Sequence, residues 1–260
     1  MRYSELIAGL RRGTAGRIET TIPDSWMQGR TTYGGLTAAL CLESAKELVP
    51  DMPVRAAQVA FIGPVGGEVV ISPHILRRGK SSAFVNVDLV SEGGIMARCI
   101  FTFGARRDSE VDQKSRQCPD APGPEACESF FGERRPNFAH NFNIRMVSGA
   151  RPVSGAKHGD MVLWLRHKDE GALWDPTTIL SLADAPPPAA LSMLTRPAPI
   201  SSMTWMAEFL TDDIRTVEGW FLVHHEAQAT KDGYSSQSMR MWNRDGDPIM
   251  IGRQTIAMFG

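Results

Sequence analysis

Apolar and polar residues alternate with the period of a β-strand in several stretches of the first 105 residues. These stretches are 16–22, 54–61, 68–77, 82–90 and 95–103. A period of two places every second side chain on the same face of a sheet, which predicts antiparallel strands with one buried face. Residues 91–94 (Ser-Glu-Gly-Gly) join the last two stretches, so these two are predicted to form a hairpin.

The first sequence that breaks this alternation is Gly-Arg-Thr-Thr-Tyr-Gly-Gly-Leu-Thr-Ala-Ala-Leu at 29–40, which predicts the opening of a long helix ending near Leu48. Its side chains are apolar on most sides, which predicts a buried helix: Ala38, Ala39, Leu40, Leu42 and Ala45. Gly34 and Gly35 precede free backbone N–H groups at a helix start and allow a ligand to approach closely. A plain tight turn with close packing explains the two glycines equally well.

The second half repeats this order after a charged and proline-rich stretch at 106–140, which is predicted to be a linker over the surface. Strand patterns recur in the second half, at 142–147, 160–166, 200–210, 219–230 and in a final hairpin. A second apolar helix begins with Asp175 as its N-cap and Pro176 in the first turn. It carries one acid, Asp184, just before the three prolines at 186–188.

The two halves also match residue by residue. Gly-Lys-Ser-Ser-Ala-Phe-Val-Asn-Val at 79–87 corresponds to Gly-Tyr-Ser-Ser-Gln-Ser-Met-Arg-Met at 233–241. The second strand of the hairpin in each half, here called the return strand, begins with Ile-Met, at 95–96 and at 249–250. Each return strand ends with Phe-Gly, at 103–104 and at 259–260. We therefore predict an α+β fold made of two fused copies of one unit, each a long helix wrapped by an antiparallel sheet, with the two sheets paired edge to edge. The predicted boundaries are 1–105, a linker over 106–140, and 141–260.

A difference between the copies indicates where a site could lie. Counted from the starts of the return strands, Ile100 falls opposite Gln254. Gln254 shares strand parity with Ile256 and Met258, so its amide is predicted to point to the apolar face, where it needs a hydrogen-bond partner. Asp184 on the helix of the same copy is the expected partner. Alone, Asp184 is explained as a helix cap or a solvated acid, and Gln254 as a structural hydrogen bonder.

Composition narrows the functional classes. The net charge of −1 and the 22% of charged residues give no reason to expect nucleic acid or an anionic membrane as a partner. No apolar run is long enough to span a bilayer, and the first twelve residues predict a small amphipathic helix rather than a signal peptide. Without a secretion signal, a disulfide between Cys118 and Cys127 is not favoured, and a cytoplasmic protein is expected.

Taken together, these motifs resemble the double-hotdog acyl-CoA thioesterases of the acyl-CoA thioesterase II type. The resemblance covers nearly the whole chain, through the stretch at 29–40, the linker near 112–114, the Leu-Ala-Asp helix at 182–184 and the C-terminal segment from 220 to 254. It implies a double hotdog fold and hydrolysis of an acyl-CoA thioester. It also implies no metal and no cofactor, and it leaves open whether the chain forms a homo-oligomer.

The resemblance also implies a set of site residues. Asp184 and Gln254 match the catalytic Asp and Gln that, with a Ser or Thr hydroxyl, hold the attacking water. The position expected for the hydroxyl is, by spacing, Pro199, so Ser201 or Ser202 is expected to supply it, with Thr204 as a less favoured choice. The substrate-binding residues are expected at the start of the first long helix, at Tyr33, Gly34 and Gly35.

Two other functions fit the same scaffold. The absence of a hydroxyl at Pro199 favours a catalytically weak acyl-CoA-binding protein, which the presence of both Asp184 and Gln254 argues against. A hotdog enoyl-CoA hydratase would need an Asp and a His close together before a helix, whereas His224 and His225 lie in a strand pattern. A serine hydrolase is disfavoured because the chain has no Gly-x-Ser-x-Gly elbow.

Overall fold

A computed structural model describes residues 1–13, 16–113 and 117–260 of the chain. The end of the motif at 112–114, Lys114, lies outside the described residues. Within the described part, the first half contains helices α1 (Tyr3–Ala8) and α2 (Gly34–Leu48) and strands β1 (Arg11–Arg12), β2 (Ile18–Thr21), β3 (Met27–Gln28), β4 (Thr31–Thr32), β5 (Val54–Phe61), β6 (Glu68–Arg78), β7 (Ser82–Ser91) and β8 (Gly94–Gly104).

The second half contains one α-helix, α3 (Pro176–Ala183), between two groups of strands. The strands are β9 (Glu128–Ser129), β10 (Phe142–Gly149), β11 (Asp160–His167), β12 (Ile200–Phe209), β13 (Phe221–Lys231), β14 (Tyr234–Asn243) and β15 (Pro248–Met258). Short 3₁₀ turns, η2 (Asp24–Trp26), η3 (Pro124–Ala126), η4 (Asn137–Asn141) and η5 (Ala189–Met193), connect these elements. No helix of the described chain is both long and apolar enough to cross a membrane.

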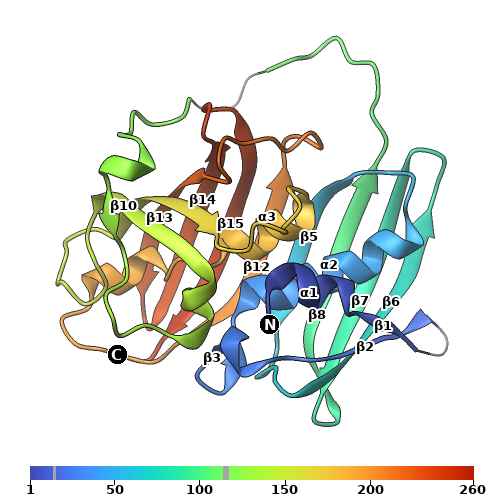
Figure 1. The fold of residues 1–260 in the computed structure, drawn as a ribbon, viewed down its shortest axis with the longest axis horizontal. Helices are drawn as coiled ribbons and strands as arrows, with labels where there is room; N and C mark the ends of the chain where they lie inside the picture. Colours follow the sequence, from blue (N-terminus) through green and yellow to red (C-terminus); the bar gives the residue numbers. More distant parts are fainter. Residues whose placement is uncertain (14–15, 114–116) are drawn as a thin grey trace.

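The described strands form one large antiparallel sheet in the order β1-β2-β6-β7-β8-β5-β12-β15-β14-β13-β11-β10-β9, with β3 and β4 as a separate small hairpin. Strands β2, β6, β7 and β8 of the first half lie on the right of Figure 1, and β10, β13, β14 and β15 of the second half lie on the left. The two halves meet where β5 pairs with β12, from Thr204 opposite Ala60 to Glu208 opposite Ala56. The predicted edge-to-edge joining of two sheets is therefore confirmed, as is the α+β double hotdog architecture.

Helices α2 and α3 lie side by side in front of the sheet (Figure 1). The two helices run antiparallel. Lys46, near the end of α2, donates to Asp175, the N-cap of α3, at 2.6 Å, and the start of α2 lies against Asp184 at the end of α3. Their buried faces are the apolar residues expected from the sequence, with Leu40 and Leu42 in α2 fully buried. This packing of two helices from different repeats creates the site described below.

The start of α2 and the counting of the repeats need correction. The chain forms the β3–β4 hairpin before α2 begins at Gly34, so the helix does not open at Gly29. Ile100 is only half-buried, whereas its neighbours Cys99 and Phe101 are fully buried, so Ile100 points away from the core. Ile100 is therefore not the counterpart of Gln254. Each hairpin has a register shift near its turn, so counting residues from the start of the return strand does not tell which face of the sheet a side chain is on.

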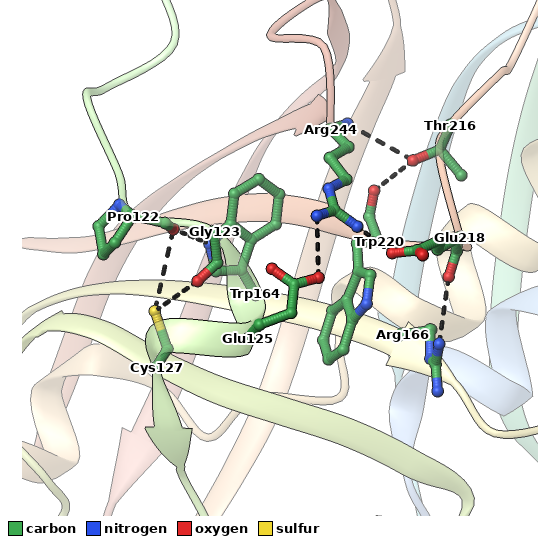
Figure 2. A network of polar contacts seen from close by, with 10 residues as sticks. All are labelled: Pro122, Gly123, Glu125, Cys127, Trp164, Arg166, Thr216, Glu218, Trp220 and Arg244. Carbon is green, nitrogen blue, oxygen red and sulfur yellow. Dashed lines mark hydrogen bonds and ion pairs between the residues drawn. The ribbon is translucent and has the colours of Figure 1, made fainter.

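The segment predicted as a surface linker packs against both halves of the chain over its later part. Phe130 and Phe138 are each 4% exposed. Figure 2 shows how polar contacts hold the preceding stretch: Arg244 forms ion pairs with Glu125 and Glu218, and the Trp164 indole N–H donates to the Pro122 carbonyl at 2.9 Å. Buried aromatic side chains and partnered ions anchor this stretch, so it is not a free surface connection.

Candidate active site

The local sequence around α3 places a carboxylate at the end of a buried helix. Asp175 caps the start by accepting the Thr178 N–H at 2.9 Å, and Pro176 occupies the first turn. The prolines at 186–188 follow the helix end and cannot continue it. Asp184 is therefore the C-cap of α3, with its side chain held between the helix and the sheet.

The glycines at the start of α2 lie directly against this carboxylate. A Cβ added at Gly34 would lie 2.7 Å from Asp184 Oδ2, and one added at Gly35 would lie 3.0 Å from the Asp184 Cβ. The first distance is shorter than real Cβ contacts, and a Cβ at Gly35 would also lie 2.8 Å from the Ser181 carbonyl oxygen, so glycine at both positions allows the helices to approach this closely. The Gly35 N–H donates to the carboxylate. The N–H donor, Gly35, therefore belongs to the first repeat, and the carboxylate, Asp184, belongs to the second.

Gln254 faces the same carboxylate from β15. It is 3% exposed, and its Nε2 donates to Asp184 Oδ1 at 2.5 Å. Its strand neighbour Ile256 is fully buried, which confirms that Gln254 points to the apolar face. The structure thus brings together Asp184, Gln254, Gly34 and Gly35 from three separate elements.

Sequence reasoning missed one further polar residue, Gln237 on β14. Gln237 is 1% exposed and lies opposite Gln254, whose Oε1 accepts from Gln237 Nε2 at 2.7 Å. The Ala189 N–H in turn donates to Gln237 Oε1 at 3.0 Å. Each amide in this chain of hydrogen bonds can have only one orientation, which presents the NH₂ group of Gln254 to Asp184. The signal was available, because the repeat comparison places Gln237 opposite Ala83.

The surroundings of Asp184 raise its pKa to about 7. Loss of hydration on burial is the main cause, because it disfavours the charged carboxylate. The donors from Gln254 and Gly35 stabilise the charge and pull the pKa part of the way back down. Near neutral pH both forms of Asp184 are populated, which suits a group that accepts a proton and later returns it.

The structure separates the two candidate serines. A register shift between Ser202 and Thr204 on β12 changes which side chains face the core. Ser201 is exposed and lies on the outer side of the sheet, so the structure does not bring it to Asp184. Ser202 is half-buried and pairs with Ile256, which lies two residues along β15 from Gln254. The residue directly opposite Gln254 is Trp205.

Tyr33 supports the site rather than opening onto it. It is the N-cap residue of α2 and is 1% exposed. Its ring stacks on Phe138 with centroids 4.4 Å apart, and its hydroxyl lies 2.9 Å from Ser181 Oγ and 3.0 Å from the Ser181 carbonyl oxygen. Burial raises the pKa of the Tyr33 hydroxyl, so the group stays protonated. These contacts fix the start of α2 against α3.

The opposite ends of the two helices do not form a second site of the same kind. There Lys46 Nζ lies 2.8 Å from Glu43 and 2.6 Å from Asp175. The Thr177 hydroxyl donates to Glu43 at 2.9 Å. The carboxylate of Glu43 is therefore paired with a cation and a hydroxyl, whereas Asp184 has only neutral partners.

The two adjacent histidines lie in a strand and not before a helix. His224 and His225 lie within β13, where His224 Nε2 contacts Asp160 at 3.1 Å, and neither precedes a helix as a hydratase pair would. Among the residues that the structure describes, no group of three or more His, Cys, Asp or Glu side chains is arranged to hold a metal ion.

Comparison with known families gives two matches in sequence. The family model for the acyl-CoA thioesterase N-terminal domain matches residues 22–104, and the model for the acyl-CoA thioesterase C-terminal domain matches residues 115–258. A comparison with curated protein sequences found no match.

Solved structures share the fold over the whole chain. A conserved protein of unknown function with a hot dog fold from Alicyclobacillus acidocaldarius has 21% identity and a TM-score of 0.87, covering 100% of this chain and 99% of that chain. An acyl-CoA thioesterase II, TesB2, from Mycobacterium marinum has 16% identity and a TM-score of 0.79, covering 99% and 98%. The tesB protein of Mycobacterium avium subs paratuberculosis has 15% identity and a TM-score of 0.81, also covering 99% and 98%. At these identities the likeness shows the fold alone.

Proposed function

This chain belongs to the acyl-CoA thioesterase family, and on that premise we propose that it hydrolyses acyl-CoA to a free acid and coenzyme A with a water activated by Asp184. The observation that carries the proposal is the hydrogen-bonded pair of Asp184 and Gln254, with an Asp184 pKa of about 7. A carboxylate with that pKa, held by neutral donors only, is suited to accept a proton at neutral pH.

The proposed reaction needs no group beyond the chain and water. Asp184 accepts a proton from the water as the water oxygen bonds to the thioester carbonyl carbon. The remaining N–H of Gln254 holds that water in place. The tetrahedral intermediate then collapses, the carbon–sulfur bond breaks, and the proton passes to the leaving sulfur of coenzyme A. The reaction consumes one water and one thioester, releases one acid and one thiol, and needs no oxidant or reductant.

The experiment that tests the function is thiol release from a panel of acyl-CoAs of short to long chain. Turnover on part of the panel supports the proposal and gives the chain preference directly. Tight binding of acyl-CoA without turnover on any chain overturns it in favour of an acyl-CoA-binding protein. Release that does not depend on the protein concentration also contradicts it.

Gln237 gives a more specific prediction. Gln237→Leu removes the donor that fixes the Gln254 amide, so Gln254 loses its single orientation toward Asp184. We expect kcat to fall about 10-fold, in the range found for groups that position a catalytic residue. The pH midpoint should also rise, because the Gln254 hydrogen bond lowers the pKa of Asp184. Steady-state kinetics from pH 5 to 9 measure both effects, and an unchanged midpoint would show that Gln237 is only structural.

A further inference from the structure

The site as described leaves one chemical need unmet. Attack on a thioester places negative charge on the carbonyl oxygen, and enzymes stabilise that charge with hydrogen-bond donors fixed in advance. The Gly35 N–H at the start of α2 already donates to Asp184, as does one N–H of Gln254. A donor that is near Gln254 and free of any protein partner would fill the need.

Trp205 carries such a donor. It lies on β12 directly opposite Gln254 in the antiparallel pairing with β15, and it is 1% exposed. Its indole Nε1 is buried and has no hydrogen-bond partner in the described protein. A buried N–H without a partner is unfavourable, because its hydrogen bond to water is lost and nothing replaces it. Groups of this kind in native structures call for an explanation, and a bound ligand is one that fits here.

The local backbone explains why the indole faces inward. The register shift between Ser202 and Thr204 places Trp205, rather than Thr204, on the same face as Gln254. Gly252, the next inward residue on β15, has no side chain, and a Cβ there would lie 3.2 Å from the Trp205 Nε1. The absence of a side chain at Gly252 therefore leaves room above the sheet for the N–H edge of the indole. Gly252 lies two residues along β15 from Gln254.

We propose that the Trp205 indole N–H binds the thioester carbonyl oxygen and stabilises the oxyanion formed from it. This inference rests on the proposed hydrolysis of acyl-CoA. An indole N–H only donates, so it can bind a carbonyl oxygen or an oxyanion but cannot accept a proton from water. Trp205 thus supplies a contact to substrate from the strand on which sequence analysis expected a serine.

The first test compares two Trp-to-Phe variants that keep an aromatic ring. Trp205→Phe should lower kcat at least about tenfold, with little change in KM or in the pH midpoint, because one donor to the transition state is lost. Its melting temperature should fall only by the cost of the smaller ring in the core, because the lost N–H has no protein partner. Trp164→Phe is the matched control: it removes an N–H bonded to Pro122 far from the site, so it should lower the melting temperature and leave kcat unchanged.

The second test observes the contact itself. A ketone analogue of acyl-CoA, with a methylene in place of sulfur, keeps the carbonyl oxygen and cannot be hydrolysed. Its binding should shift one indole N–H resonance among those of the six tryptophans, and that resonance should be missing in Trp205→Phe. Binding without a shift at Trp205, or a Trp205→Phe enzyme with wild-type kcat, overturns this inference alone. A wild-type protein without turnover overturns the proposed function instead.

Discussion

Asp184→Asn should lower kcat at pH 8 by about 10²- to 10⁴-fold, the range that a positioned general base contributes. The Asn amide keeps the size of the side chain and an oxygen that can accept from Gln254, but it cannot take a proton from water. The loss should appear in kcat with a small change in KM, because the proposed role of Asp184 lies in the chemical step. Thiol release under saturating acyl-CoA measures it.

The pH dependence separates a base from a merely structural carboxylate. Wild-type kcat/KM should fall about tenfold for each pH unit below the Asp184 pKa of about 7, because only the ionised form accepts a proton. The residual activity of Asp184→Asn should not follow that curve. Glu43→Gln is the matched control, since it neutralises a carboxylate at the opposite helix ends and should keep wild-type kcat and pH midpoint. Equal turnover by Asp184→Asn and wild type would remove Asp184 from the mechanism.

Asp184→Asn should also stabilise the protein at neutral and higher pH. The folded pKa of Asp184, about 7, lies above the value of about 3.9 for an unfolded Asp, so the folded state binds this proton more tightly. That contribution to stability is complete below about pH 4 and is lost as the pH rises to 7. The melting temperature of Asp184→Asn should therefore exceed that of wild type by an amount that grows between pH 4 and 7 and then levels off.

The sequence predicts most of the fold because its strong signals are local. Alternation gave β5 its exact span, and the Asp175-Pro176 pair marked the start of α3. Strand parity alone placed Gln254 on the buried face. Each of these depends on residues close together in the chain, where period and capping act directly.

The parts of the site that escaped prediction depend on register and on distant contacts. Trp205 faces Gln254 only because β12 shifts register after Ser202, and no local residue pattern marks that shift. Gly35 meets Asp184 because helices from two repeats pack antiparallel, which joins residues far apart in sequence. Simple counting placed Ile100 opposite Gln254 for the same reason: turn irregularities change parity without leaving a gap in the sequence.

Gly35→Ala tests that contact between the repeats. The new Cβ would lie 2.7 Å from the Tyr33 ring and 2.8 Å from the Ser181 carbonyl oxygen, so backbone atoms of α2 or α3 must move. Overpacking of this kind costs about 1–3 kcal/mol. A displacement of about 1 Å at a catalytic group costs about 100-fold in rate. We therefore expect Gly35→Ala to lose about 100-fold or more in kcat and to unfold at lower denaturant.

The readout that identifies the cause is the pH midpoint of kcat/KM in Gly35→Ala. Alanine keeps the backbone N–H, so any loss of its bond to Asp184 comes from displacement, and losing that bond should raise the midpoint because the bond lowers the Asp184 pKa. Gly132→Ala is the control, since a Cβ there meets no atom within 4 Å and both kcat and stability should stay near wild type. Wild-type kcat in Gly35→Ala would mean that the close approach of α2 to Asp184 is not needed for hydrolysis.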